Sequence, residues 1–232
     1  KEAFMQYKAV IFDLFETLIT EWGHKKYTKN ELCADLNVSR EDFDIYWDEK
    51  TSAQYLGTIT FQESLQYVCE KCGQNITPAQ IETITAKRIQ TKSDCFNYIL
   101  PEVFDLLEQL KAMGLKTAIV SNCSSEEVEV LRDSKLCDYF DEIILSYEVH
   151  MKKPDICIYE EAARRLGVLT EECLFVGDGG SNELFGAKDA GMKPVQAKWY
   201  TNKYPKKREN IGNLLRAEEP MDITNIILKR GQ

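Results

Sequence analysis

Short apolar runs alternate along this chain with longer segments whose apolar residues follow helical spacing. Five runs have the length of strands, at residues 8–13, 115–121, 142–145, 173–177 and 194–197. Between them, Val103, Leu106 and Leu110 recur at the spacing of one helix face, and Gly114 follows as a helix-ending residue. Ser181 is the expected N-cap of a later helix. This alternation predicts an α/β fold, a Rossmann-like doubly wound parallel sheet with helices on both faces.

Residues 21–95 depart from the alternation, because they contain no run typical of a buried strand. Thr77 and Gln80 have the spacing of a capping box, which predicts the start of a helix between them. We therefore predict a helical cap domain over residues 21–95, inserted into a core formed by residues 1–20 and 96–232. The insertion begins just after the first strand, so it can fold over the end of that strand.

Composition and charge narrow the expected partners. The 232 residues are 44% apolar and 29% charged, which is typical of a globular domain rather than a disordered chain. The net charge of −9 disfavours nucleic acid and anionic membranes, which favour a basic face. No apolar stretch approaches the ~20 residues of a membrane helix, and no signal-peptide core is visible. We expect a cytoplasmic protein, monomer or homodimer, with a small-molecule substrate.

Two local features have simple explanations. The basic residues Lys203, Lys206, Lys207 and Arg208 predict a solvated loop in a chain that is acidic overall. The eight cysteines do not predict disulfides in a chain of this length without an export signal.

Cys69 and Cys72 form a single Cys-x-x-Cys, whereas a zinc site would need two more ligands and the chain has only two histidines. We expect most of the cysteines to be core residues. Cys123 is of interest because it follows a strand end.

Four polar residues lie at or near the ends of the predicted strands: Asp13, Ser121, Lys153 and Asp178. Ligands of open α/β sheets bind at this edge. Asp13 is a candidate nucleophile, because a carboxylate can form a covalent intermediate. Asp13 and Asp178 together would hold Mg²⁺, which prefers oxygen ligands, with Asn182 accepting from a metal-bound water. Lys153 would neutralise charge on a transferring phosphoryl group, and Ser121 would hydrogen-bond its oxygens.

Four segments carry a family resemblance: FDLFETL at 12–18, VSN at 120–122, KPD at 153–155 and VGDGGSN at 176–182. This set resembles the four motifs of the haloacid dehalogenase-like hydrolase superfamily, including the helical cap inserted after the first motif. The resemblance implies that Asp13 is the nucleophile, Lys153 the charge clamp and Asp178 a metal ligand. It further implies that Thr17 stabilises the first loop, that Ser121 and Asn122 bind the phosphoryl group, and that the main-chain carbonyl of Phe15 faces the metal.

Phe15 departs from the family pattern. Phosphatases of the family usually carry a second Asp two residues after the nucleophile, which protonates the leaving oxygen and later activates water. Phe15 can do neither, and such acid–base help contributes ~10²–10⁴ in rate. Glu16 is adjacent, but its side chain should point elsewhere. We expect a phosphatase that is weakened or that prefers activated leaving groups.

Two alternative functions remain at this point. An aromatic residue at position 15 is similar to the 2-haloacid dehalogenases of the same superfamily, whose halide leaves without a proton. Against this, those enzymes lack the acid that corresponds to Asp178 and place an Arg after a cap Trp, whereas Lys50 is the only cation close after Trp47. The second alternative is a phosphate-binding module with little turnover.

The preferred interpretation is a Mg²⁺-dependent phosphatase acting on a small phosphorylated metabolite. Its substrate would be selected by residues of the cap, with Trp22 and Lys50 as the substrate-binding candidates. Glu21, Trp47 and Tyr55 are further candidates, although aromatic residues in a helical cap more often serve packing than recognition.

Overall fold

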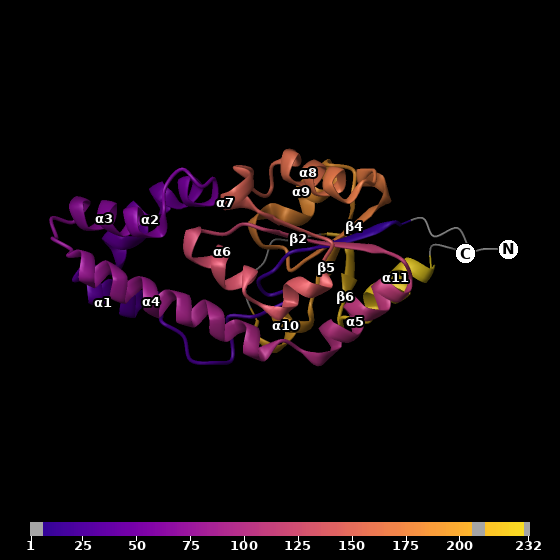
Figure 1. Cartoon of the computed structure of the whole chain (residues 1–232), viewed down its shortest axis with the longest axis horizontal. Helices are drawn as coiled ribbons and strands as arrows, with labels where there is room; N and C mark the ends of the chain where they lie inside the picture. The colour runs from indigo at the N-terminus through magenta and orange to yellow at the C-terminus, as the bar shows by residue number, and fades with distance from the viewer. Residues whose placement is uncertain (1–6, 206–211, 230–232) are drawn as a thin grey trace.

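The central sheet positions the site. The computed structural model describes residues 7–205 and 212–229, and within them six strands form one parallel sheet in the order β3-β2-β1-β4-β5-β6 (Figure 1). The strands are β1 (Ala9–Phe12), β2 (Lys116–Ser121), β3 (Glu142–Leu145), β4 (Cys173–Gly177), β5 (Lys193–Ala197) and β6 (Leu215–Ala217). The predicted Rossmann-like parallel fold is confirmed.

Helices cover both faces of the sheet. They are α5 (Pro101–Ala112), α6 (Ser125–Arg132), α7 (Ser146–Val149), α8 (Ile156–Leu166), α9 (Glu183–Asp189), α10 (Trp199–Lys203) and α11 (Asp222–Lys229). Val10 and Phe12 of β1 pack on the face covered by α5 and α11, while Ala9 and Ile11 pack on the opposite face against α8 and α9. Both faces of β1 are therefore buried, which explains its unbroken apolar sequence.

Four helices between β1 and α5 form a separate layer, which we call the inserted bundle. They are α1 (Lys29–Leu36), α2 (Arg40–Tyr55), α3 (Phe61–Lys71) and α4 (Pro78–Asp94). The bundle has its own apolar cluster, in which Phe43, Phe61 and Leu65 are fully buried. Figure 1 shows this bundle, in indigo and purple, beside the carboxyl ends of the strands. The expected capping box of Thr77 and Gln80 is present at the start of α4.

The order of the strands brings two loops together. β1 lies between β2 and β4, so the chain changes direction across the sheet between β3 and β4. In doubly wound sheets the crevice at such a reversal is the usual ligand site. The loops after β1 and β4 open at this point, and Asp13 N donates to Val176 O at 2.9 Å.

Some elements differ from the sequence-based expectation. Ser181 does not cap a helix through its side chain; it lies in a 3₁₀ turn, Gly180–Asn182, and α9 begins at Glu183. Further 3₁₀ turns are Cys95–Tyr98, Lys135–Tyr139 and Thr170–Glu172. The short elements β6, α7, α10 and α11 were not predicted. Lys203 ends α10, whereas Lys206, Lys207 and Arg208 lie outside the described residues. In the part of the chain that the structure describes, no helix is long and apolar enough to span a membrane.

Candidate active site

Asp13 lies directly after β1 in a tightly bonded loop. The residue is 7% exposed, and its carboxylate accepts a hydrogen bond of 3.2 Å from Thr17 Oγ1. The carbonyl of Thr17 in turn accepts from Trp199 Nε1 at 2.8 Å. Thr17 therefore supports the loop and one carboxylate oxygen, and it does not line the cavity described below.

Lys153 joins Asp13 to a second acid. Its Nζ donates to Asp13 Oδ1 and, at 2.6 Å, to Glu183 Oε2, and the side chain is 3% exposed. Burial by itself would lower the pKa of Lys153, but the negative charges of Asp13 and Glu183 outweigh burial and raise it. The amine therefore stays charged beside the candidate nucleophile and keeps a positive charge in the site.

Glu183 is held in place by the end of β4. Its Oε1 accepts from Gly179 N at 3.1 Å. A Cβ on Gly177 would come within 2.3 Å of the same oxygen, so the carboxylate needs the glycine beneath it. Burial and then the charge of Asp13 raise the pKa of Glu183 to about 8. A nearby cation would stabilise the charged form of such a buried carboxyl group.

Asp13, Asp178 and Glu183 form a group able to hold a metal ion. Each offers a carboxylate oxygen, these oxygens lie within 4.8 Å of one another, and all three residues are buried. Gly180 N donates to Asp178 Oδ1 at 2.8 Å, and Gln196 Nε2 donates to the Asp178 carbonyl at 3.1 Å. Three clustered carboxylates fit a hard divalent cation, which takes oxygen ligands and offsets their mutual repulsion.

Ser121 is the last residue of β2, Asn122 follows it, and both face the same space. Within the described residues Ser121 Oγ is buried without a hydrogen-bond partner, an arrangement that costs about 1–3 kcal/mol unless a ligand or water satisfies it. Asn122 Nδ2 donates to the Lys153 carbonyl at 2.9 Å, and Lys153 N donates to Asn122 Oδ1 at 2.8 Å. Asn122 thus ties the loop after β2 to the loop that carries Lys153.

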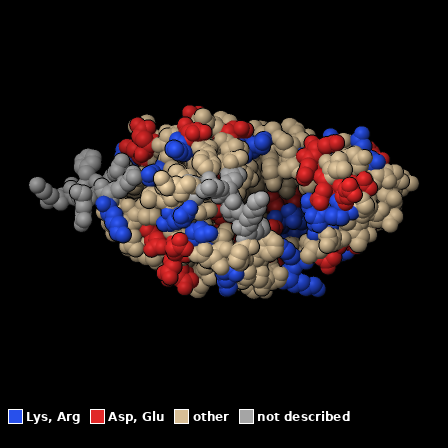
Figure 2. All heavy atoms as spheres, turned by 180° about the vertical axis from the view of Figure 1, so that it is seen from behind, with Lys and Arg blue, Asp and Glu red and all other residues tan. Residues whose placement is uncertain are grey.

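These groups surround one cavity of about 380 Å³. The core contributes Asp13, Phe15, Glu16, Ser121, Asn122, Glu127, Lys153, Asp178, Gly180, Ser181 and Glu183. The linker and the inserted bundle contribute Glu21, Tyr55, Arg88 and Lys92. Figure 2 shows Lys and Arg side chains gathered beside the hollow between the bundle and the core. Any ligand of the site would therefore touch both parts of the chain.

Several residues proposed from the sequence do not line this cavity. Lys50 Nζ lies 3.8 Å from the centre of the Tyr67 ring, and Lys26 Nζ lies 3.4 Å from the centre of the Trp22 ring. Asn182 is exposed in the turn before α9. Trp47 stacks on Phe43 and meets Phe61 edge-on, which is a packing role within the bundle, whereas Tyr55 and Glu21 do reach the cavity.

Phe15 and Glu16, which follow the candidate nucleophile in the first loop, make different side-chain contacts. Glu16 has a positive φ of 62°, and its carboxylate accepts from Thr20 Oγ1 at 2.6 Å and from Glu21 N at 3.1 Å. These contacts hold its carboxylate against its own loop, and Glu16 nevertheless lines the cavity. Phe15 lines the cavity, and its ring lies 4.1 Å from Lys92 Nζ.

The sequence analysis did not single out Glu183, Arg88, Lys92 or Glu127. Glu183 follows Asp178 by five residues, and it carries no local motif that marks it as part of a site. Glu127 forms a capping box with Ser124, a spacing that is visible in the sequence. Arg88 and Lys92 lie four residues apart on α4, and no local signal separates them from ordinary exposed helix positions.

No cysteine of the described residues lines this cavity. Burial, followed by the charge of Glu127, raises the pKa of the Cys123 thiol to about 12. Cys69 is buried in the bundle, and within the described ranges Asp13, Asp178 and Glu183 are the one group able to hold a metal.

The comparison with known families agrees with this arrangement. A family model described as haloacid dehalogenase-like hydrolase matches residues 7–191, a span that contains every residue of the cavity. The chain belongs to this haloacid dehalogenase-like (HAD-like) hydrolase family.

Curated relatives of this HAD-like hydrolase include proteins named as phosphatases. Glyceraldehyde 3-phosphate phosphatase of Methanopyrus kandleri is 26% identical over 230 residues, which is 95% of this chain and 97% of the relative. Protein CbbY of Rhodobacter capsulatus is 28% identical over 200 residues, covering 82% and 85%.

Solved structures share the fold. A 2-haloacid dehalogenase from Pseudomonas syringae has a TM-score of 0.66 and 23% identity, covering 97% of this chain and all of its own. A HAD phosphatase from Thermococcus onnurineus has a TM-score of 0.62 and 22% identity, covering 95% and 97%. Because enzymes of both names have this fold, the fold does not choose between them.

Proposed function

We propose that this HAD-like hydrolase is a Mg²⁺-dependent phosphatase that acts on a small phosphorylated metabolite. The group of Asp13, Asp178 and Glu183 carries the proposal, because three buried carboxylates within 4.8 Å need a cation before a phosphate can approach. Curated relatives named as phosphatases support it. Residues 21–95 are proposed to act as the cap, since Glu21, Tyr55, Arg88 and Lys92 line the cavity.

The residues of the site have distinct proposed roles. The three carboxylates, with the main-chain carbonyl of Phe15, would hold Mg²⁺, which supplies charge neutralisation when bound. Asp13 attacks phosphorus, Lys153 offsets charge on the phosphoryl oxygens, and the unpartnered Ser121 hydroxyl donates to one of them. The cavity of about 380 Å³ suits a small ester.

The test is hydrolysis of p-nitrophenyl phosphate with and without Mg²⁺. We expect activity with Mg²⁺ that EDTA removes and that Asp13→Asn abolishes. Because Phe15 supplies no proton, aryl esters should react faster than alkyl esters such as glycerol 2-phosphate. Turnover that survives in Asp13→Asn, or equal rates on aryl and alkyl esters, would contradict this assignment.

Phe15 is the observation that favours the second candidate, a 2-haloacid dehalogenase, because a halide needs no acid to leave. Release of chloride from 2-chloropropionate in the presence of EDTA would support the dehalogenase. Without chloride release, metal-dependent phosphate binding that is not followed by turnover would indicate a binding module.

A further inference from the structure

One part of the cavity remains for the portion of a substrate that is not the phosphoryl group. The proposed place of the phosphoryl group, beside Asp13, Ser121 and Lys153, takes up the core side of the cavity. The rest of an ester therefore lies against other lining residues. Those from the bundle, the linker before it and α6 are Glu21, Tyr55, Arg88, Lys92 and Glu127, which we call the leaving-group wall.

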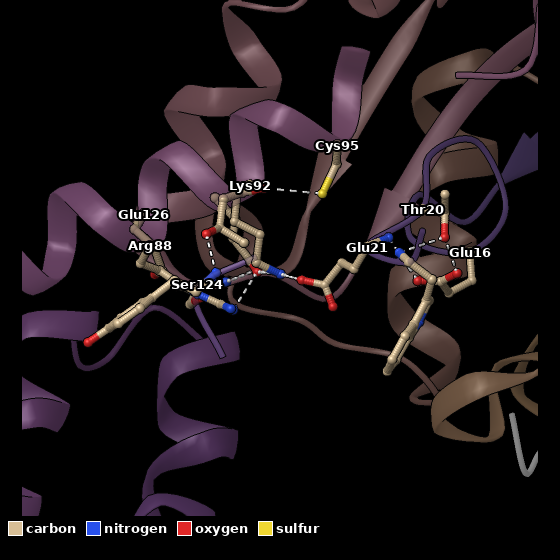
Figure 3. A network of polar contacts seen from close by, with 12 residues as sticks. Glu16, Thr20, Glu21, Arg88, Lys92, Cys95, Ser124 and Glu126 are labelled. Carbon is tan, nitrogen blue, oxygen red and sulfur yellow. Dashed lines mark hydrogen bonds and ion pairs between the residues drawn. The ribbon is translucent and has the colours of Figure 1, made fainter. Parts of the chain in front are cut away.

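The two cations of the leaving-group wall are already paired with acids. Lys92 Nζ donates to Glu21 and to Glu127, each at 2.5 Å (Figure 3). Arg88 Nε donates to Glu126 at 3.2 Å, and Arg88 Nη2 donates to Glu127 at 3.1 Å. Because all of these side chains are 28% exposed or less, water and salt screen the ion pairs only weakly.

The leaving-group wall therefore has no positive charge in excess. Burial would raise the pKa of Glu127, but Lys92 and then Arg88 outweigh burial and lower it. The same two cations lower the pKa of Glu21 to about 2. Two charged acids thus balance the two cations, and Glu126 behind Arg88 adds no positive charge in either of its protonation states.

The core side of the cavity does not supply an excess of positive charge either. Among the described residues Lys153 is the one core cation that lines the cavity, and Asp13, Asp178 and Glu183 lie around it. A divalent cation offsets these acids, but a phosphoryl group brings up to two negative charges of its own. A second anion on the substrate would find no unpaired cation in this part of the chain.

The leaving-group wall does offer unused hydrogen-bond donors. A guanidinium has five N–H donors and an ammonium group has three, whereas Arg88 and Lys92 each use two on acids of the described residues. The hydroxyl of Tyr55, which is half-buried in the same wall, is a further donor. Donors without net charge suit uncharged oxygen acceptors. An ammonium group on a substrate has no lone pair with which to accept from them.

We propose that the substrate is a phosphate ester whose leaving group is uncharged and carries hydroxyl or carbonyl oxygens, as in a polyol phosphate. This substrate class rests on the proposed phosphatase function. Oxygens of the leaving group accept from Arg88, Lys92 and Tyr55 while the ion pairs of the wall stay intact. A carboxylate in the same place is repelled by Glu21 and Glu127, so the wall discriminates against it.

The test compares 3-(hydroxymethyl)phenyl phosphate with 3-carboxyphenyl phosphate. The two esters differ in one group of similar size, and their phenols have similar basicity, so the chemical step is matched. With Mg²⁺, kcat/KM for the hydroxymethyl ester should be higher by at least about tenfold, because like charges repel strongly in a partly buried site. Phenyl phosphate should lie between them, about threefold below the hydroxymethyl ester, because it lacks the hydrogen-bonding oxygen.

Glu21→Gln tests the source of this preference. It removes one acid of the leaving-group wall, while Glu127 still pairs with Lys92. The preference for the hydroxymethyl ester over the carboxyl ester should shrink about fivefold. Glu129→Gln is the matched control, because Glu129 is exposed on α6 and does not line the cavity. This control should keep the ratio of the unmodified enzyme.

Two results would overturn the substrate class: a carboxyl ester that reacts as fast as the hydroxymethyl ester or faster, and an unchanged ratio in Glu21→Gln. The first comparison uses the unmodified enzyme, so it decides the matter even where the Glu21 variant does not fold. If none of the three esters shows turnover that Asp13→Asn abolishes, the phosphatase function itself is rejected instead.

Discussion

At the scale of single residues, Phe15 is proposed to set the leaving-group preference of the site. It lies in the first loop, lines the cavity and has no proton to give. The neighbouring Glu16 also lines the cavity, and its carboxylate accepts from Thr20 Oγ1 and from Glu21 N. We therefore expect leaving groups that need little help from an acid to react best at this site.

Phe15→Asp should increase kcat/KM for glycerol 2-phosphate by at least about tenfold, a modest part of the ~10²–10⁴ that general acid–base catalysis contributes. The rate on p-nitrophenyl phosphate should change much less, because its leaving group needs no proton. Phe15→Leu is the control and should keep the original ratio. A ratio that is unchanged in Phe15→Asp would show that residue 15 does not set leaving-group preference.

The sequence located Asp13, Ser121, Lys153 and Asp178 because each follows or lies near a strand end, and the structure gathers all four around one cavity. Glu183 was missed, because its role depends on the turn that folds it back onto Gly179. Lys50 and Trp22 were selected by residue type alone. Whether a helical side chain faces a cavity depends on how the bundle packs, which local sequence does not specify.

At the scale of elements, the sequence predicted helices and strands best where the pattern of apolar residues extended over many positions. The buried strands and the helices with regular spacing were predicted closely, whereas β6 has only three residues, Leu215–Ala217, and α10 only five. Elements this short form because neighbours pair with them, so their own sequence carries little periodicity. The start of α4 was visible because its cap is a local motif.

Thr77→Ala should lower the free energy of unfolding by about 1 kcal/mol, since it removes the N-cap of α4. Thr83→Ala is the matched control on the same helix. Thr83 is exposed and bonds only to the Ala79 carbonyl, so alanine there should be neutral or stabilising by a few tenths of a kcal/mol. Urea unfolding of both variants measures the difference, and equal effects would contradict the capping role.

At the scale of the whole molecule, charge pairing holds the bundle against the core. Arg88 and Lys92 on α4 face Glu126 and Glu127 on α6 and Glu21 in the linker. Burial would raise the pKa of Glu21, but Lys92 followed by Arg88 outweighs it and lowers the pKa to about 2. A carboxyl with a lowered pKa stabilises the folded state above its unfolded pKa and stops doing so as pH falls.

Glu21→Gln should therefore reduce stability at pH 7 by about 2 kcal/mol, taking ~1.4 kcal/mol per pKa unit with a discount for partial exposure. The difference from the unmodified protein should shrink as pH falls from about 4.5 towards 2. Denaturant unfolding across this range gives the comparison. A difference that stays constant with pH would mean that the charge of Glu21 contributes nothing.

Mg²⁺ should raise the melting temperature of the unmodified protein in proportion to the logarithm of its concentration, because it binds the folded state only. At a hundred times the dissociation constant this amounts to about 2.7 kcal/mol. Asp178→Asn should lose most of the shift, since it removes one of the three clustered carboxylates. Equal shifts in the two proteins would place the metal elsewhere.

Gly177 limits which amino-acid substitutions this enzyme can accept during evolution. A methyl group at that position would collide with the Glu183 carboxylate at 2.3 Å. Alanine at residue 177 should consequently be tolerated only together with a shorter acid, such as aspartate, at residue 183. The two positions are expected to vary as a pair among diverged or engineered descendants, and a library randomised at both would recover that coupling.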